Sequence, residues 1–428
     1  MRQNEKMIGT WRACAALASV ALLPSVGRAQ DSGTVPPSTP ANAPAGAPGP
    51  GAPGPQAGGP PPLPVLLGFA DFLLTLERPW RAEPLYRLIL MQDPNNEVAQ
   101  RGLRDALNQQ KIGFTSLAHS YYDSKDVQLF AYGGGPVIRT PLGKVTVTVG
   151  NGYYKNNNNP NNRRNPLSKV PTIPTAEDNF ALNKQTYNVE FQPFWGKNME
   201  HEGSAWVSWQ TYDSVPDRLL YDFRYSYIPK PGREKFTFGT GRHDSFYQNQ
   251  INQFLAPETF FQLQRRITFN DYYTAIEYPL AQKYDLNFTY RHFKYRDNNE
   301  RNNFRTVLWY RLKPTNPMKP MPVWRVGLDG IVDQGRFFTL DYGIPRDFRS
   351  LSIATDYVML TRDLKYVVYL SYPIAEKNFA APAGLVAYVS KTLGRDKRFE
   401  VYGKSVILEA RNLSVSLYDY VLGLNTRF

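Results

Sequence analysis

The sequence is poor in cysteine, in histidine and in long apolar runs. It contains one cysteine, Cys14, and four histidines among 428 residues. Cys14 lies inside the first apolar segment, so disulfides, thiolate metal sites and a cysteine nucleophile are excluded from the rest of the chain. No apolar run reaches the roughly eighteen residues that a membrane-spanning helix needs. We expect no metal ion and no cofactor.

Aromatic and basic residues are plentiful. There are 28 Tyr, 24 Phe and 7 Trp, and the formal net charge is +13. The basic residues are spread along the chain and cluster only in short pairs such as Arg163-Arg164, so nucleic acid is not expected as a partner. The mean hydropathy of −0.46 excludes a bundle of membrane helices. It is compatible with a membrane β-barrel, whose strands alternate apolar and polar residues.

The first sixty residues predict a targeting signal followed by a linker. Three basic residues precede the apolar stretch 13–23, and Gly27 and Ala29 place small residues before a cleavage point. This is the pattern of a secretory signal peptide, which we assign to residues 1–29. Residues 30–62 are almost entirely Pro, Gly, Ala and small polar residues, which predicts a disordered linker.

Residues 63–112 have the 3.6-residue periodicity of helices, interrupted around Pro94. The spacing resembles one tetratricopeptide repeat, in which Ala70 and Ala82 are the small positions, Tyr86 is the aromatic position and Pro94 ends the second helix. Small residues at these places allow two helices to approach closely. An unrelated helical hairpin is the alternative interpretation.

From Gly113 onward the apolar period changes to two, as in Tyr187, Val189 and Phe191 with polar residues between them. Alternation of this kind is typical of strands with one apolar and one polar face. Most segments are near the 9–11 residues of a strand that crosses a bilayer. The candidate strands are 114–122, 127–139, 144–155, 186–195, 203–213, 217–228, 234–243, 266–279, 285–296, 303–313, 322–334, 348–361, 364–373, 383–394, 398–409 and 412–428.

We therefore predict a mainly β protein in which residues 113–428 form an antiparallel transmembrane β-barrel of sixteen strands, within a range of 14–18. Links from even to odd strands are mostly tight, whereas the long links 156–185, 244–265 and 335–347 join odd to even strands. Outer-membrane barrels have short periplasmic turns and long external loops, so both termini are expected in the periplasm. The alternative, a soluble sandwich or propeller, would have strands nearer five or six residues.

The last strand carries a specific pattern. Tyr420, Leu422, Leu424 and the terminal Phe428 share one face. The segment resembles the C-terminal strand of Gram-negative outer-membrane proteins, in which a terminal Phe marks the chain for barrel assembly. This resemblance implies location in the cell outer membrane, contact with lipid and lipopolysaccharide, and the barrel assembly machinery as a partner.

The polar faces of the strands predict a water-filled, mildly basic pore. By alternation, the pore-lining residues are Arg224, Lys235, Arg291, Arg305, Arg311, Arg325, Lys365, Glu190, Asp222, Glu277, Asp329 and Asp356. Aromatic residues such as Trp309 and Tyr369 fall between them and offer flat rings to a sugar. For each single residue the alternative is an ion pair that only holds neighbouring strands together.

A signal peptide, a helical-repeat segment and a C-terminal sixteen-strand barrel together resemble the outer-membrane exopolysaccharide exporters, such as the outer-membrane component of cellulose synthase and the poly-N-acetylglucosamine porin. The resemblance implies a secretion pore and a periplasmic scaffold that serves a synthase complex. That family has many repeats and this chain has at most one. The basic lumen also resembles that of the alginate pore, which would imply an acidic polymer; a neutral polymer stays equally open.

Two other functions are considered. A general or solute-selective porin would fold a long loop such as 244–265 into its lumen. A barrel enzyme would need a catalytic group such as His243 with Asp244 and Ser245, but neighbours along a strand face opposite sides. We therefore expect a transport protein and no enzyme.

Overall fold

A computed structural model describes most of the chain after the linker. The described residues are 62–75, 77–123, 127–157, 179–196, 200–229, 234–244, 268–281, 283–296, 298–312, 323–336, 347–361, 363–377, 383–394, 398–410 and 415–428. The predicted signal peptide, linker residues 30–61 and nearly all of the long link 244–265 lie outside them.

Three helices precede the strands: α2 (Leu63–Thr75), α3 (Pro79–Gln92) and α4 (Glu97–Gln110). Ala70, Ala82 and Tyr86 are fully buried between them, as small and aromatic contact positions require. The Tyr86 hydroxyl donates to Asp71 Oδ1 at 2.6 Å, and its ring packs against Gly102 of α4. Pro94 is exposed after the end of α3. The helical prediction for this region is confirmed, and its identity as a tetratricopeptide repeat stays a prediction.

The connection between α2 and α3 is a tight turn that ends helix α2. Arg78 N–H donates to Leu73 O at 2.9 Å and Glu77 N–H donates to Leu74 O at 3.0 Å. This is a Schellman motif, in which the residue after the cap adopts a left-handed conformation and is usually glycine. Here the residue is Glu77, with φ 57°. For a residue with a Cβ that backbone costs about 1 kcal/mol.

None of the described helices is long and apolar enough to cross a membrane. Sixteen strands follow α4. They are β1 (Gly113–Asp123), β2 (Val127–Thr140), β3 (Gly143–Asn157), β4 (Asn179–Trp195), β5 (His201–Tyr212), β6 (Arg218–Tyr227), β7 (Lys235–His243), β8 (Phe269–Ala281), β9 (Tyr284–Tyr295), β10 (Glu300–Arg311), β11 (Val323–Gly335), β12 (Asp347–Leu360), β13 (Leu364–Lys377), β14 (Ala383–Leu393), β15 (Phe399–Ala410) and β16 (Val415–Arg427).

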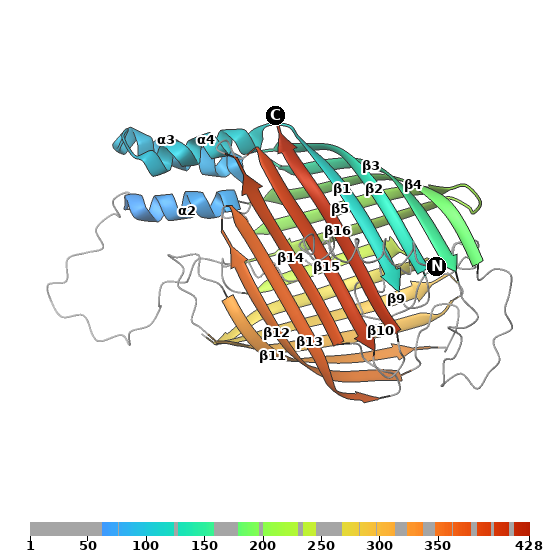
Figure 1. Cartoon of the computed structure of the whole chain (residues 1–428). Helices are drawn as coiled ribbons and strands as arrows, with labels where there is room; N and C mark the ends of the chain where they lie inside the picture. The colour runs from blue at the N-terminus through green and yellow to red at the C-terminus, as the bar shows by residue number, and fades with distance from the viewer. Residues whose placement is uncertain are drawn as a thin grey trace, which may run out of the picture.

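Each strand pairs antiparallel with its sequence neighbours, and β1 pairs with β16 to close the barrel. The closing pair runs from Gly113 opposite Arg427 to Asp123 opposite Leu417. Closure leaves no strand edge exposed, because every backbone row has a partner. The predicted sixteen-stranded antiparallel barrel is confirmed (Figure 1).

The outward face of the barrel exposes large apolar side chains to the surroundings. Trp209, Phe223, Ile353 and Tyr372 are between 44% and 54% exposed. A soluble barrel would not leave such a surface in water, whereas a lipid bilayer covers it. The middle of β1 has the small outward residues Ser116, Ala118 and Ser120, and there the partner strand supplies the apolar surface: Ser116 lies beside Leu424.

The predicted assembly residues are on this face. Tyr420, Leu422 and Leu424 alternate along β16 and point outward, and Leu422 is exposed. Phe428 follows the strand and its amide donates to Ile112 O at 3.1 Å. Their role as an assembly signal stays a prediction.

The inward face is less uniformly polar than alternation predicts. Tyr121, Leu129, Tyr154, Leu182 and Leu408 come together in a buried apolar cluster on β1–β4 and β15. These residues alternate in step with the inward polar residues of their strands, so this part of the inner wall is apolar although the sequence predicts a polar inward face. Leu417 of β16, which lies between β15 and β1, belongs to the same cluster, so apolar side chains from six neighbouring strands cover one another there.

The helices lie at one end of the barrel, which we call the helical rim (Figure 1). It is the end at which even-numbered strands stop and odd-numbered strands begin, and the C-terminus of β16 lies there too. Arg81 of α3 donates to Gly196 O at 2.9 Å, directly after β4. The helical segment is thus fixed to the strands by side-chain contacts as well as by the chain.

Candidate functional site

All twelve residues predicted to line the pore lie on the inward face, opposite the exposed apolar side chains. They do not form a free basic surface. Arg224 pairs with Asp222, Arg305 with Asp329, and Arg325 with Asp356. The remaining predicted cations pair with carboxylates outside the predicted set: Lys235 with Glu202, Arg291 with Asp271, Arg311 with Asp285, and Lys365 with Glu77.

The pairs connect neighbouring strands into a continuous network. Arg325 of β11 donates through Nε to Asp356 of β12 at 3.0 Å and approaches Asp285 of β9 at 3.4 Å, which also accepts from Arg311 of β10 at 2.7 Å. Four consecutive strands are joined by these contacts. The expectation that such pairs hold strands in register describes this wall directly.

The predicted aromatic rings are placed differently from the expectation. Trp309 is fully buried beneath the Arg325 guanidinium, which lies 5.0 Å from its ring centroid. Tyr369 is buried beside it and donates to Asp329 Oδ2 at 2.8 Å. Neither ring can stack on a sugar, because neighbouring side chains cover both faces. Their function is to fill and fix the inner wall.

Glu190 and Glu277 complete the predicted set. Glu190 of β4 accepts from Gln192, and Glu277 of β8 lies opposite Lys235 of β7. Whether these groups and the cations line a path for a solute stays a prediction.

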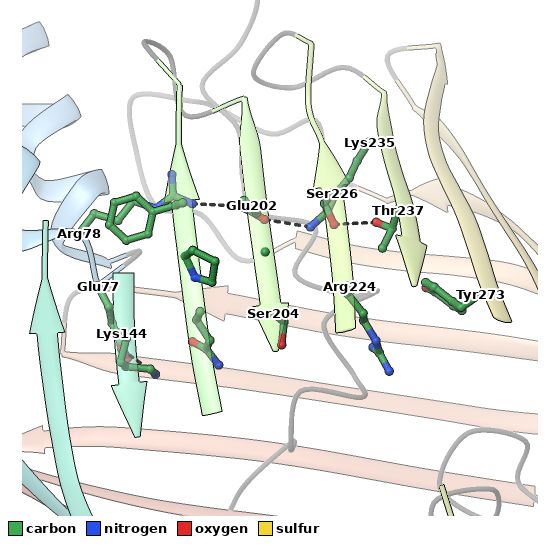
Figure 2. A pocket seen from close by; sticks show the side chains of 14 residues that line it. Glu77, Arg78, Lys144, Glu202, Ser204, Arg224, Ser226, Lys235, Thr237 and Tyr273 are labelled. Carbon is green, nitrogen blue, oxygen red and sulfur yellow. Dashed lines mark hydrogen bonds and ion pairs between the residues drawn. The ribbon is translucent and has the colours of Figure 1, made fainter. Parts of the chain in front are cut away.

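A cavity of about 110 Å³ opens on the inner wall at the helical rim (Figure 2). Residues of the α2–α3 connection and of strands β3–β8 line it, including Glu77, Lys144, Glu202, Arg224 and Tyr273. Small-molecule pockets measure about 300–1,000 Å³, so this space is narrow with the helices in place.

Glu77 lies at the centre of a group of cations. Its carboxylate accepts from Lys144 Nζ of β3 at 3.2 Å and from Lys365 Nζ of β13 at 3.0 Å, and Arg139 Nη2 of β2 lies 3.8 Å away. Lys144 and then Lys365 hold the pKa of the Glu77 carboxyl well below its ordinary value, although burial opposes them.

Arg78, the next residue, makes a second anchor. Its guanidinium donates to Glu202 Oε1 of β5 at 2.5 Å and lies 4.8 Å from the ring centroid of Phe194. Lys235 donates to the other oxygen of Glu202 at 3.3 Å. Two adjacent residues of one turn therefore contact β2, β3, β4, β5 and β13. Since β14, β15, β16 and β1 lie between β13 and β2, these contacts join two separate parts of the rim.

Several residues of this site were missed by the sequence reasoning. Asp271 and Asp285 lie an even number of positions from residues of the same strands that were predicted to face inward, so alternation could have identified them. Glu202 lies one position before the predicted start of its strand. Glu77 has no detectable signal, because its contacts depend on how the helices sit on the barrel.

His243, the candidate catalytic base, is fully buried and lies 3.2 Å from Asp222. Asp244 turns toward Arg218 at 3.7 Å, and Ser245 lies outside the described residues. A buried imidazole is not accessible to a substrate. Within the part of the chain that the structure describes, no group of three or more His, Cys, Asp and Glu side chains is arranged to hold a metal ion.

No family model and no curated protein matches the chain. Solved structures resemble it over 74% of its length. A bacterial polysaccharide outer membrane secretin has 9% identity, 99% coverage of its own chain and a TM-score of 0.48. CdiB from Acinetobacter baumannii has 8% identity, 60% coverage and a TM-score of 0.39, and OccAB1 from the same organism has 12%, 96% and 0.37.

Proposed function

We propose that the chain is an outer-membrane pore that secretes an exopolysaccharide, with helices α2–α4 on the periplasmic side. The observation that carries the proposal is a closed sixteen-stranded barrel with an apolar outer surface and helices anchored at one end by their α2–α3 connection. Barrels of about this size leave an aqueous interior rather than a fully packed core.

The membrane assignment rests on the outward face. Its exposed aromatic and aliphatic side chains match a hydrocarbon environment, and closed barrels satisfy all backbone groups without water. Lipid and lipopolysaccharide are the proposed surroundings. The barrel assembly machinery is the proposed partner of the last strand, with Leu422 and Phe428 as part of its signal.

The helices favour export over simple diffusion. A porin that is always open has no need for a turn that inserts charged side chains into its rim, whereas a secretion pore must be closed when no polymer passes. The helices also expose Phe69, Met91 and Val98 on their outer surface. We propose that this surface contacts a periplasmic protein, such as part of a polysaccharide synthase complex, as one repeat of the tetratricopeptide type would.

The alternative is a general or solute-selective porin for small hydrophilic molecules. The inner wall favours it in one respect: its Arg–Asp pairs of mixed sign, such as Arg305 with Asp329, suit hydrated solutes of either charge. In that case the helices would only attach the barrel to another component of the cell envelope.

The test is deletion of the gene in its own host, followed by complementation with the full chain. Export predicts loss of surface polysaccharide with unchanged uptake of small sugars, and recovery on complementation. A porin predicts slower uptake with unchanged surface polysaccharide. The purified chain reconstituted in a planar bilayer should give stepwise currents, and a chain that stays monodisperse without detergent would contradict both functions.

A further inference from the structure

The cations around Glu77 form a site with a carboxylate already in it. Arg139, Lys144 and Lys365 come from three strands and converge on one side chain from the helical segment. The geometry points to an anion site on the barrel that the protein occupies with its own carboxylate. We propose that this site binds the carboxylate of an acidic sugar once the α2–α3 connection withdraws, so that Glu77 is an internal competitor of the transported molecule.

The charge balance supports binding after withdrawal. Near the three cations, Arg427 lies 3.7 Å from Glu400, and Glu400 is the other carboxylate whose charge acts on Lys365. Without Glu77 and Arg78, five cations of the described strands (Arg139, Lys144, Lys235, Lys365 and Arg427) face two carboxylates, Glu202 and Glu400. Such an excess at a partly desolvated rim attracts an anion.

Arg139 gives independent support. Its side chain is more than nine-tenths buried, and its Nε finds no hydrogen-bond partner among the described residues. A buried guanidinium N–H without an acceptor is costly. A carboxylate brings two oxygens, and the arginine fork suits such a ligand better than Glu77 alone, whose nearest oxygen is 3.8 Å away.

The backbone at Glu77 indicates that its side chain is kept for this contact. A Schellman stop favours glycine at the left-handed position, yet the chain places Glu77 there with φ 57°. The substitution Glu77→Gly should therefore relax the helix stop while it removes the competing carboxylate. This variant therefore removes the Glu77 carboxylate without destabilising the end of the helix.

The inference rests on the proposed pore, and its experiment uses the full mature chain in planar bilayers. We expect Glu77→Gly to raise the open fraction about tenfold over the unchanged chain. Glucuronate added at the helical side should then block the Glu77→Gly current, and glucose at the same concentration should not. Lys144→Gln with Lys365→Gln in that background should abolish the block.

Glu83→Gln is the matched control. Glu83 is a carboxylate of α3 that accepts from Arg87 and Gln110 and touches none of the three cations. This variant should keep the closed behaviour of the unchanged chain. A band shift between heated and unheated samples verifies that each variant has a folded barrel.

Equal currents with and without Glu77, or a block by glucose as strong as that by glucuronate, would overturn the inference. A block by inorganic phosphate but not by glucuronate would overturn the assignment to carboxylates. Binding of glucuronate to the detergent-solubilised Glu77→Gly chain, measured by calorimetry, tests the site even if no variant conducts. Binding there with no conductance would sustain the site and contradict the pore, whereas no binding would contradict the site.

Discussion

The strongest stability prediction concerns the ion pair between Arg301 of β10 and Asp333 of β11. Both side chains are completely buried. The guanidinium donates to both oxygens of Asp333, and Asn303 Nδ2 donates to Oδ2 at 2.8 Å. The Arg301 guanidinium also lies 5.6 Å from the ring centroid of Phe293. Tyr295 also hydrogen-bonds Arg301, but Asp333 supplies the counter-charge in this ion pair.

Asp333→Ala should lower the free energy of unfolding by about 3–5 kcal/mol, because it leaves a buried cation without its counter-charge. The double variant Arg301→Met with Asp333→Leu should recover most of that loss, since neither charge then has to be desolvated. The measurement is urea unfolding of the barrel in lipid vesicles, followed by tryptophan fluorescence and by the mobility of unheated samples on gels.

The exposed pair between Arg349 and Asp347 is the control. Its closest atoms are 3.3 Å apart, but the Arg349 side chain is 53% exposed. Water screens such a pair, so Arg349→Ala should cost less than about 1 kcal/mol. If Asp333→Ala costs no more than Arg349→Ala, the conclusion that the inner wall depends on buried charge pairs is refuted.

Three further outcomes are expected. Acid should open the pore. Lys144 and Lys365 lower the pKa of the Glu77 carboxyl only while the α2–α3 connection is docked on the barrel, so the ionised carboxyl stabilises the docked state at pH values above its free pKa of about 4.3. This stabilisation is lost as the pH falls through the lowered pKa. Conductance should rise on acidification in the unchanged chain, and a rise of the same size in Glu77→Gln would contradict this reasoning. Gly102→Ala places a Cβ 2.2 Å from the Tyr86 ring, so the cost of overpacking, about 1–3 kcal/mol, should outweigh the better helix propensity of alanine. The helices should then be digested faster by a protease, and an unchanged rate of digestion would contradict the packing of Tyr86 against Gly102. Leu422→Arg on the outward face should destabilise the barrel in vesicles by about 2–4 kcal/mol if that residue lies in the middle of the bilayer, and a neutral effect would place it outside the lipid.

The strands were predictable because lipid outside and polar groups inside leave a period of two in the sequence. The prediction was least accurate where the alternation reverses. β4 begins at Asn179, seven residues before the predicted start, and in this added part Asn183 and Gln185 are exposed on the outward face while Leu182 is buried on the inward face. A search for an apolar outward face therefore misses the first part of this strand.

The site was predictable only in part. Parity assigned Lys365 and Arg325 to the inner face, but the register between strands decides which carboxylate each one meets. Glu77 precedes the barrel in sequence, and its contacts span 288 positions to Lys365. Such a contact arises from the docking of one folded part on another, for which local sequence carries no periodic signal.

The pairing of β1 with β16 has a consequence for the order of events in biogenesis. The first strand meets its partner only when the final residues of the polypeptide have been delivered. Lys144 on β3 and Lys365 on β13 belong to opposite halves of the chain, and that last seam brings them within reach of a single side chain. The contacts of the turn with β3 and β5 do not depend on this seam, whereas the contact between Glu77 and Lys365 does, so the turn is held from both sides only after the barrel has closed.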